Sequence, residues 1–273
     1  MTTPGAAVGT AAVARAAEPR RRVVITGMGA VTPIGVGRER FWQAALAGTN
    51  GVVPLAYGEL PRDRELWGGQ VGPDRFPREQ FSERELADLS FPARFALVAA
   101  REAMADAGLA AQPAGERPVD PWRFGVCLGS GTGNPRQTGA AVIVERKSGV
   151  GQIPRRSLAK LPATGVARPL ARAFDLRGPH QVFTTSCMAG NNAIARAADV
   201  IAAGRADAMV TGGAEAMSWV MAHGFRMLTH LRGEALVRSQ PFSAGRRGVI
   251  VGEGAAVLVL ESLEGARRRG AEV

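Results

Sequence analysis

The run FTTSCMAGNNAIARAADVI, residues 183–201, joins a short β-rich segment to a helix of mostly small residues, with a cysteine at the join. β-Branched and aromatic side chains favour a strand over residues 181–185. From residue 188 to residue 203 the apolar residues return at helical spacing, and Ile194 and Ile201 fall on one face. A strand that leads directly into a helix is the repeating unit of layered α/β folds.

The strand-then-glycine pattern recurs elsewhere in the chain, in RVVITGMG, RFGVCLGSGTG and ADAMVTGGAEA. The other expected elements are a strand over 22–26, helices over 41–46 and 95–107, a strand and glycine turn over 123–133, helices over 142–146 and 166–174, a strand and turn over 206–216, two strands within 248–262 that join at 252–254, and a helix over 263–269. Residues 51–90, rich in Pro, Gly and charge, are expected to form a long surface excursion. This order predicts an α/β fold with a mixed sheet and helices on both faces.

The composition sets limits on the class of protein. Of the 273 residues 46% are hydrophobic but only 5% are aromatic, so Ala, Val, Leu and Ile must fill the core. No apolar run approaches the roughly 18 residues of a membrane-spanning helix. Residues 1–20 lack the compact apolar region of a signal peptide and are expected to be a disordered Ala/Gly-rich extension, with the domain proper over 21–273. Two cysteines in unlike contexts make no disulfide framework, which favours a cytoplasmic location.

The formal net charge is +10, which raises the question of an anionic partner. The arginines are scattered in short groups, without interleaved aromatic residues and without zinc-finger spacing. Neither nucleic acid nor a membrane is therefore an expected partner. The charge alone leaves open whether it serves an acidic protein partner or reflects an arginine-rich coding background.

Cys187 is the strongest candidate for chemistry. A thiol at the first turn of a helix lies near unpaired N–H groups and the positive end of the helix dipole, which favour the thiolate. A sharp strand-to-helix turn also exposes a nucleophile, and its own N–H can help to bind an oxyanion. The alternative is a buried, inert cysteine, and Cys127 inside the apolar FGVCL fits that description. Local sequence leaves both roles open for Cys187.

A dinucleotide-binding oxidoreductase is a weaker hypothesis. Gly27 and Gly29 in TGMGAVTPIG match two glycines of the dinucleotide fingerprint, but Thr32 stands where the third glycine belongs. No acidic residue that could bind a ribose occurs between positions 44 and 58. No cofactor is expected on this basis.

The three histidines are His180, His223 and His230. A Cys–His pair requires closeness in space, which the sequence does not show, and each histidine is more typical of a surface or packing position. No spacing of His, Cys or carboxylate residues matches a metal site, so no metal is expected.

Five motifs together resemble the β-ketoacyl-ACP synthases, above all the elongating type II fatty-acid and polyketide enzymes. The motifs are RRVVITGMGAVTPIG, LGSGTG, LRGPHQVFTTSCMAGNNAI, GRADAMVTGGAEAM and QPFSAGRRGVIVGEGAAVLVLESLEGARRRGA, in order over residues 21–273. The resemblance implies a thiolase-like fold, of which this chain is the N-terminal half, and assembly as a dimer. It also implies that Cys187 takes an acyl chain from an acyl carrier protein as a thioester. A carbanion from malonyl-carrier then attacks that thioester.

The resemblance assigns roles to other residues as well. Thr132 in the GSGTG turn would line the acyl pocket at the dimer interface, and Met188 and Phe225 would join it as substrate-binding residues. Arg155 and Arg156 in IPRRSLAKLP fall where family members present basic residues to the acidic carrier protein.

The departures from the family pattern concern the second half of the fold. That half carries two catalytic histidines, a lysine and a glycine-rich loop, and no histidine here stands in a matching motif. Ser243 and Arg247 replace two acidic residues of the family pattern. We therefore expect the cysteine-bearing half of a ketosynthase that works with a partner chain. The alternative is a non-catalytic relict that binds carrier protein or modulates chain length, but a relict has no need of Cys187.

Overall fold

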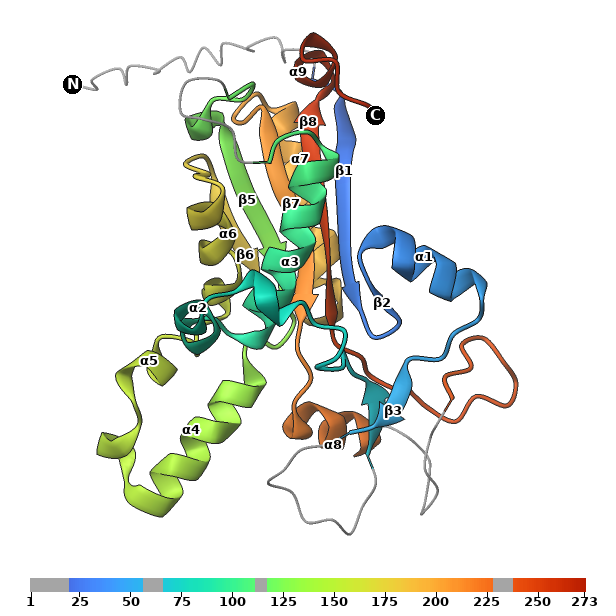
Figure 1. The fold of residues 1–273 in the computed structure, drawn as a ribbon, viewed down its shortest axis with the longest axis vertical. Coiled ribbons are helices and arrows are strands. Elements are labelled where there is room, and N and C mark those ends of the chain that lie inside the picture. The colour runs from blue at the N-terminus through green and yellow to red at the C-terminus, as the bar shows by residue number, and fades with distance from the viewer. Residues whose placement is uncertain (1–19, 56–65, 111–116, 228–237) are drawn as a thin grey trace, which may run out of the picture.

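The computed structural model describes residues 20–55, 66–110, 117–227 and 238–273, and every structural statement below concerns these residues (Figure 1). The expected extension over 1–20 lies, apart from its last residue, outside the described residues. The elements are β1 (Val23–Thr32), β2 (Gly35–Val36), α1 (Arg38–Leu46), β3 (Val52–Pro54), β4 (Trp67–Gly69), α2 (Glu83–Asp88), α3 (Phe91–Asp106), β5 (Phe124–Gly129), α4 (Pro135–Ser148), α5 (Arg155–Leu158), α6 (Arg168–Ala173), β6 (His180–Phe183), α7 (Ala189–Ala202), β7 (Ala208–Glu215), α8 (Trp219–Met227), β8 (Gly254–Ser262) and α9 (Leu263–Arg268).

The main sheet is mixed, as the sequence predicts. Its strand order is β2-β1-β8-β7-β5-β6. β5 runs parallel to both β6 and β7, whereas β8 runs antiparallel to both β1 and β7. The carboxyl ends of β5, β6 and β7 therefore meet at one edge of the sheet, where α/β proteins place their sites.

Alternate residues of the strands pack on helices of opposite faces. On one face Val126 and Leu128 of β5 join a core with the apolar side of α3, which crosses the sheet in Figure 1. On the other face Cys127 packs with Ala193, Ala197 and other small residues of α7. The period-two alternation of strand side chains thus separates the two cores.

The GMG motif of β1 has a packing role. A Cβ on Gly29 would lie 2.0 Å from the carbonyl oxygen of Ala99 in α3. The backbone of α3 can approach β1 this closely only because no side chain intervenes. This accounts for the glycines that a dinucleotide hypothesis would have assigned to a pyrophosphate.

Two sequence predictions need correction. Residues 248–262 contain one strand, β8, and not two, because the ladder with β7 begins at Gly254 and the preceding residues make only an isolated bridge at Gly252. Residues 51–90 are not merely a surface excursion, since they include β3, β4 and α2. Phe81 and Leu86 of this segment are buried in the α3 core, an apolar contribution that the surrounding Pro, Gly and charged residues hid in the sequence.

Candidate active site

The backbone turns sharply between β6 and α7. A 3₁₀ turn over Ser186–Met188 joins the two elements, and α7 begins at Ala189. Ser186 adopts φ of 52°, a left-handed conformation that is costly for a residue with a side chain. Cys187, directly after it, is exposed. This is the geometry of a nucleophile turn, with the thiol presented outward at the start of a helix.

Cys127 has the opposite setting. It lies in the middle of β5, fully buried against α7. Burial raises the pKa of its thiol to about 11, so the reactive thiolate is scarce at neutral pH. The two cysteines thus differ in exposure, with Cys127 buried and Cys187 exposed.

An open cavity of about 650 Å³ lies over Cys187, at the edge of the sheet where β5, β6 and β7 end. Ligand sites of globular proteins commonly span about 300–1,000 Å³. The lining includes Ser186, Gly131, Thr132, Glu215, Met221 and Phe225, with the segment 249–256 on another wall. Thr132 and Phe225, two of the expected substrate-binding residues, therefore share one cavity with Cys187.

Met188 is placed differently. Its side chain is 54% exposed, and Met188 is not among the residues that line the cavity. Cys187 and Met188 are neighbours in the same 3₁₀ turn, and of the two only Cys187 lines the cavity.

Glu215 is a residue of the cavity that the sequence reasoning missed. It ends β7, and its carboxylate accepts hydrogen bonds from the Gly131 N–H (2.7 Å), the Thr132 N–H (3.3 Å) and the Thr132 hydroxyl. Burial raises the pKa of Glu215, and these donors oppose the rise. A single acidic residue that closes the apolar run AMVTGGAE was the available signal.

Glu253 is a second carboxylate in the lining, and it is buried more deeply than Glu215. It is 6% exposed and accepts hydrogen bonds from the N–H groups of Val71 (3.0 Å) and Met217 (2.9 Å). Burial raises the pKa of Glu253 as well. Val71 follows β4 and Met217 follows β7, so the Glu253 side chain links both segments to the start of β8.

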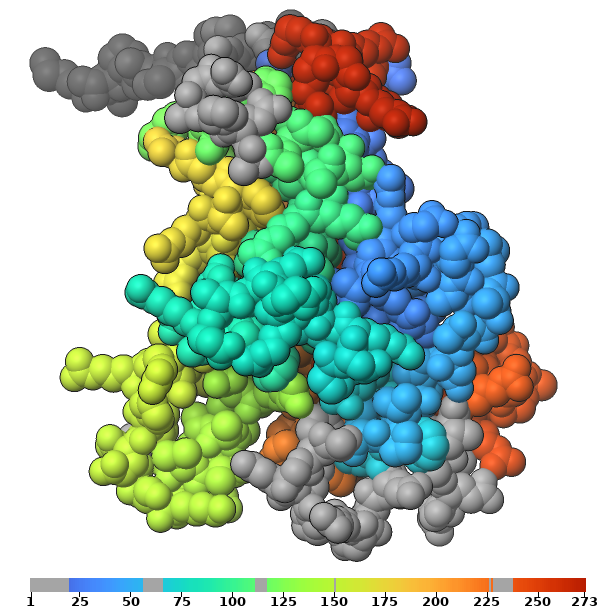
Figure 2. All heavy atoms as spheres, in the orientation of Figure 1, coloured from blue at the N-terminus to red at the C-terminus, as the bar shows by residue number. Residues whose placement is uncertain are grey.

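Arg155 and Arg156 lie away from the cavity. Both are exposed on α5, in a segment that projects from the body of the molecule beside α4 (Figure 2). Lys160 follows on the same segment, and burial together with the charge of Arg94 lowers its pKa. Positive groups therefore gather around α5.

The described histidines do not reach the cavity lining. His180 begins β6 at the end opposite to Cys187, and His223 packs edge-on against Trp219 with 6.2 Å between ring centroids. His230 lies outside the described residues. Within the part of the chain that the structure describes, no group of three or more His, Cys, Asp or Glu residues could hold a metal ion.

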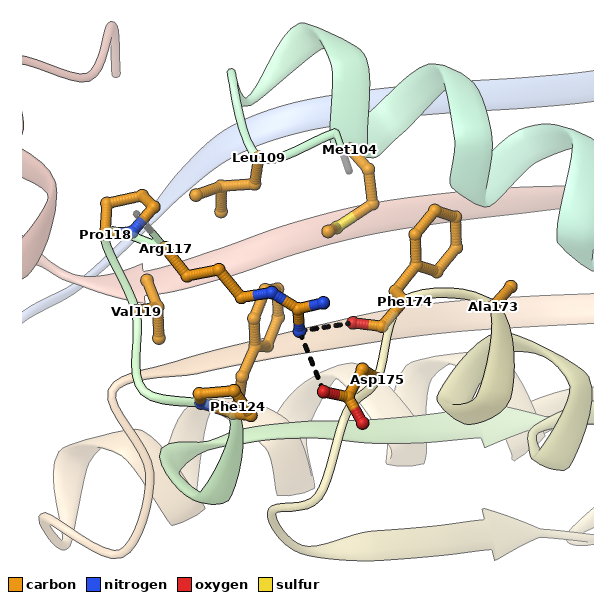
Figure 3. Close-up of a pocket in the computed structure, with 10 residues that line it drawn as sticks. Met104, Leu109, Arg117, Pro118, Val119, Phe124, Ala173, Phe174 and Asp175 are labelled. Atoms are coloured by element: carbon orange, nitrogen blue, oxygen red, sulfur yellow. Dashed lines mark hydrogen bonds and ion pairs between the residues drawn. The ribbon is translucent and has the colours of Figure 1, made fainter. Parts of the chain in front are cut away.

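A second cavity lies at the opposite end of β5 (Figure 3). Its volume on the same measure is only about 40 Å³, far below that of a substrate site. Arg117 extends along it and donates to the carbonyl of Phe174 and to the carboxylate of Asp175. This cavity is a packing gap closed by an ion pair, whereas the Cys187 cavity combines the volume of a ligand site with an exposed thiol and is the candidate active site.

Residues 20–266 match the family model of the β-ketoacyl synthase N-terminal domain. The chain belongs to this family. The β-ketoacyl synthase fold is the thiolase-like one, as the motifs predict, and the mixed sheet described above is its N-terminal part. Among the described residues no helix has the length and apolar character needed to cross a membrane.

Three relatives illustrate the match. The 3-oxoacyl-[acyl-carrier-protein] synthase 2 of Vibrio cholerae is 34% identical over 265 residues, 93% of this chain and 61% of the relative. The solved ishigamide ketosynthase/chain length factor has a TM-score of 0.79 at 30% identity, over 93% of this chain and 61% of that one. A type II polyketide ketosynthase, bound to a hexaketide and in complex with its acyl-carrier protein, has a TM-score of 0.74 at 30% identity with the same coverage. The β-ketoacyl synthase chain thus spans about three-fifths of the length of these relatives.

Proposed function

We propose that this chain provides the nucleophile-bearing half of a β-ketoacyl-ACP synthase. The Cys187 thiolate attacks the carbonyl carbon of an acyl thioester on the carrier protein, the bond to the carrier sulfur breaks, and the carrier thiol leaves with a proton. The acyl group remains on Cys187 as a thioester. The observation that carries the proposal is the exposed thiol on a strained turn inside an open cavity, while the other cysteine is sealed in the core.

The second part of the reaction follows from the first. Decarboxylation of a malonyl unit on the carrier protein yields CO₂ and a carbanion, which attacks the acyl-Cys187 carbonyl and returns the cysteine as thiolate. The product is a β-ketoacyl chain on the carrier. The acyl chain bound to Cys187 extends along the cavity past Thr132 and Phe225, and Met188 borders it only at the surface.

We expect the histidines that assist decarboxylation to lie in the second half of the fold, packed beside α7. An exposed apolar strip supports this placement. Ile25 and Met28 of β1 pair with Leu260 and Leu258 of β8 on the α7 face, yet their side chains stay 44% and 45% exposed because α7 packs mainly over β5 and β7. Soluble proteins seldom leave such strips uncovered.

The acidic carrier protein is proposed to dock on α5. Arg155 and Arg156 are exposed there, and a related ketosynthase has been solved in complex with its acyl-carrier protein, which supports a carrier protein as the partner. Complementary charge raises the association rate more than the lifetime of a complex.

Acyl loading tests the proposal. The protein is co-expressed with a second half that carries the family histidines and is incubated with an acyl-carrier thioester. Intact-mass and peptide mass spectrometry should place the acyl group on Cys187, with loading abolished in Cys187→Ala and retained in Cys127→Ala. An adduct on Cys127, or undiminished loading without Cys187, refutes the assignment. Carrier binding without any adduct on the wild-type protein would favour the non-catalytic alternative.

A further inference from the structure

We propose that Glu215 is a positioning residue for Cys187. Its carboxylate holds the Gly131–Thr132 turn against the backbone of Ser186, and this contact keeps the nucleophile turn in its strained conformation. The inference rests on the role proposed above for Cys187.

The first step of the argument is the set of contacts made by the carboxylate. Glu215 accepts from two consecutive backbone N–H groups, those of Gly131 and Thr132, and from the Thr132 hydroxyl. A carboxylate has two oxygens with about four lone-pair sites, so one side chain can accept all three of these hydrogen bonds. The turn is therefore attached to the end of β7 through a single side chain.

The second step is the position of this turn between Glu215 and the nucleophile segment. A Cβ placed on Gly131 would lie 3.0 Å from the Ser186 carbonyl oxygen and 3.2 Å from a carboxylate oxygen of Glu215. Gly131 thus lies between them, and a side chain at this position would be tightly packed against both. Movement of the carboxylate would be passed through Gly131 to the Ser186 peptide.

The third step is the strain at Ser186. A non-glycine residue at φ of 52° persists only when its surroundings hold it there. Cys187 is the next residue, so its Sγ position depends on the same backbone angles. The Ser186 hydroxyl lies 3.9 Å from that Sγ. Loss of the Glu215 hydrogen bonds to the Gly131–Thr132 turn would let the Ser186 backbone relax and would turn the Cys187 thiol away from the cavity.

Glu253 does not share this role, although it lines the same cavity. Its hydrogen bonds come from the N–H groups of Val71 and Met217, and neither residue belongs to the nucleophile turn or to the Gly131–Thr132 turn. Glu215 also differs from a general base, because all three of its hydrogen bonds are to groups of the Gly131–Thr132 turn. Its action on the reaction is indirect, through geometry.

The test compares Glu215→Gln with a matched control, Glu261→Gln. Glu261 is 1% exposed and bonded to Thr26 and Arg269, so it is a hydrogen-bonded carboxylate, more deeply buried than Glu215, that lies outside the cavity. Two rates are measured on the complex with the second half present: alkylation of Cys187 by iodoacetamide, and acyl transfer from the carrier. Glu215→Gln should slow both by tenfold or more with an unchanged KM for the acyl carrier. Glu261→Gln should lower the melting temperature and leave both rates within twofold.

Two smaller changes at Thr132 test the same contact in case Glu215→Gln fails to fold. Thr132→Val removes one of the three donors and should slow alkylation severalfold, while Thr132→Ser keeps the hydroxyl and should restore the wild-type rate. Equal rates for Glu215→Gln and wild type, or equal losses for the Glu215 and Glu261 variants, would overturn the inference. Failure of the proposed function looks different, because the wild-type protein would then carry no acyl adduct while the alkylation comparison still holds.

Discussion

Gly129→Ala should displace the start of α7 and slow acyl transfer to Cys187. Gly129 ends β5, which is held between β6 and β7 in the sheet. A Cβ at this position would lie 2.2 Å from the carbonyl carbon of Ala189 and 2.4 Å from the nitrogen of Gly190. These are backbone atoms of the first helical turn, directly after the nucleophile.

The size of the effect follows from these distances. Ordinary contact between such atoms begins near 3.4 Å, so one partner must move by about 1.2 Å. β5 is fixed by hydrogen bonds on both edges, and the helix start is the part that yields. Overpacking of a core typically costs about 1–3 kcal/mol. A displacement of about 1 Å at a reacting group can cost on the order of 10²-fold in rate.

Urea unfolding and the acyl-loading rate measure the two consequences separately. Gly129→Ala should lower the urea midpoint at an unchanged slope and reduce loading by about 10²-fold. Gly224→Ala in α8 is the matched control, because no atom lies within 4 Å of the added carbon. It should leave loading unchanged and stabilise α8 by up to about 1 kcal/mol. Wild-type loading and stability in Gly129→Ala would refute the reasoning.

Three other outcomes are expected. Replacing Arg155 and Arg156 by Glu should weaken carrier binding and make it less dependent on salt, because exposed charges are screened over about 10 Å at 0.1 M salt. Titration across a salt series measures both effects, and wild-type binding that does not change with salt would rule out electrostatic docking of the carrier on α5. Leu128→Ala, at a fully buried site, should lower the free energy of unfolding by about 2–5 kcal/mol in urea titrations. Hydrogen bonds from Arg123 hold the pKa of Asp207 below its usual value, so the stability that this pair contributes is present above the pKa of Asp207 in the unfolded chain and is lost as pH falls through its pKa in the folded protein. Asp207→Asn should therefore weaken the fall of melting temperature at acid pH, and an unchanged fall would contradict this.

Local sequence was enough for the elements that carry the nucleophile. Residues 181–203 predict a strand and a helix because β-branching and side-chain periodicity are properties of residues close together in the sequence. The structure places β6 and α7 there. Cys127 inside an apolar strand and Cys187 at a strand-to-helix join are likewise distinguishable by their neighbours alone. The ordered motifs identified the family for the same reason.

Only the tertiary structure decided what surrounds Cys187. Thr132, Glu215 and Phe225 are separated from it by tens of residues, and the register between parallel strands brings them to one edge of the sheet. The same holds for Phe81, whose charged and proline-rich neighbours suggest a surface segment but whose ring meets the core of α3. Periodicity reports which face of an element is apolar, whereas contacts between distant segments depend on how the whole chain closes on itself, which no local pattern encodes.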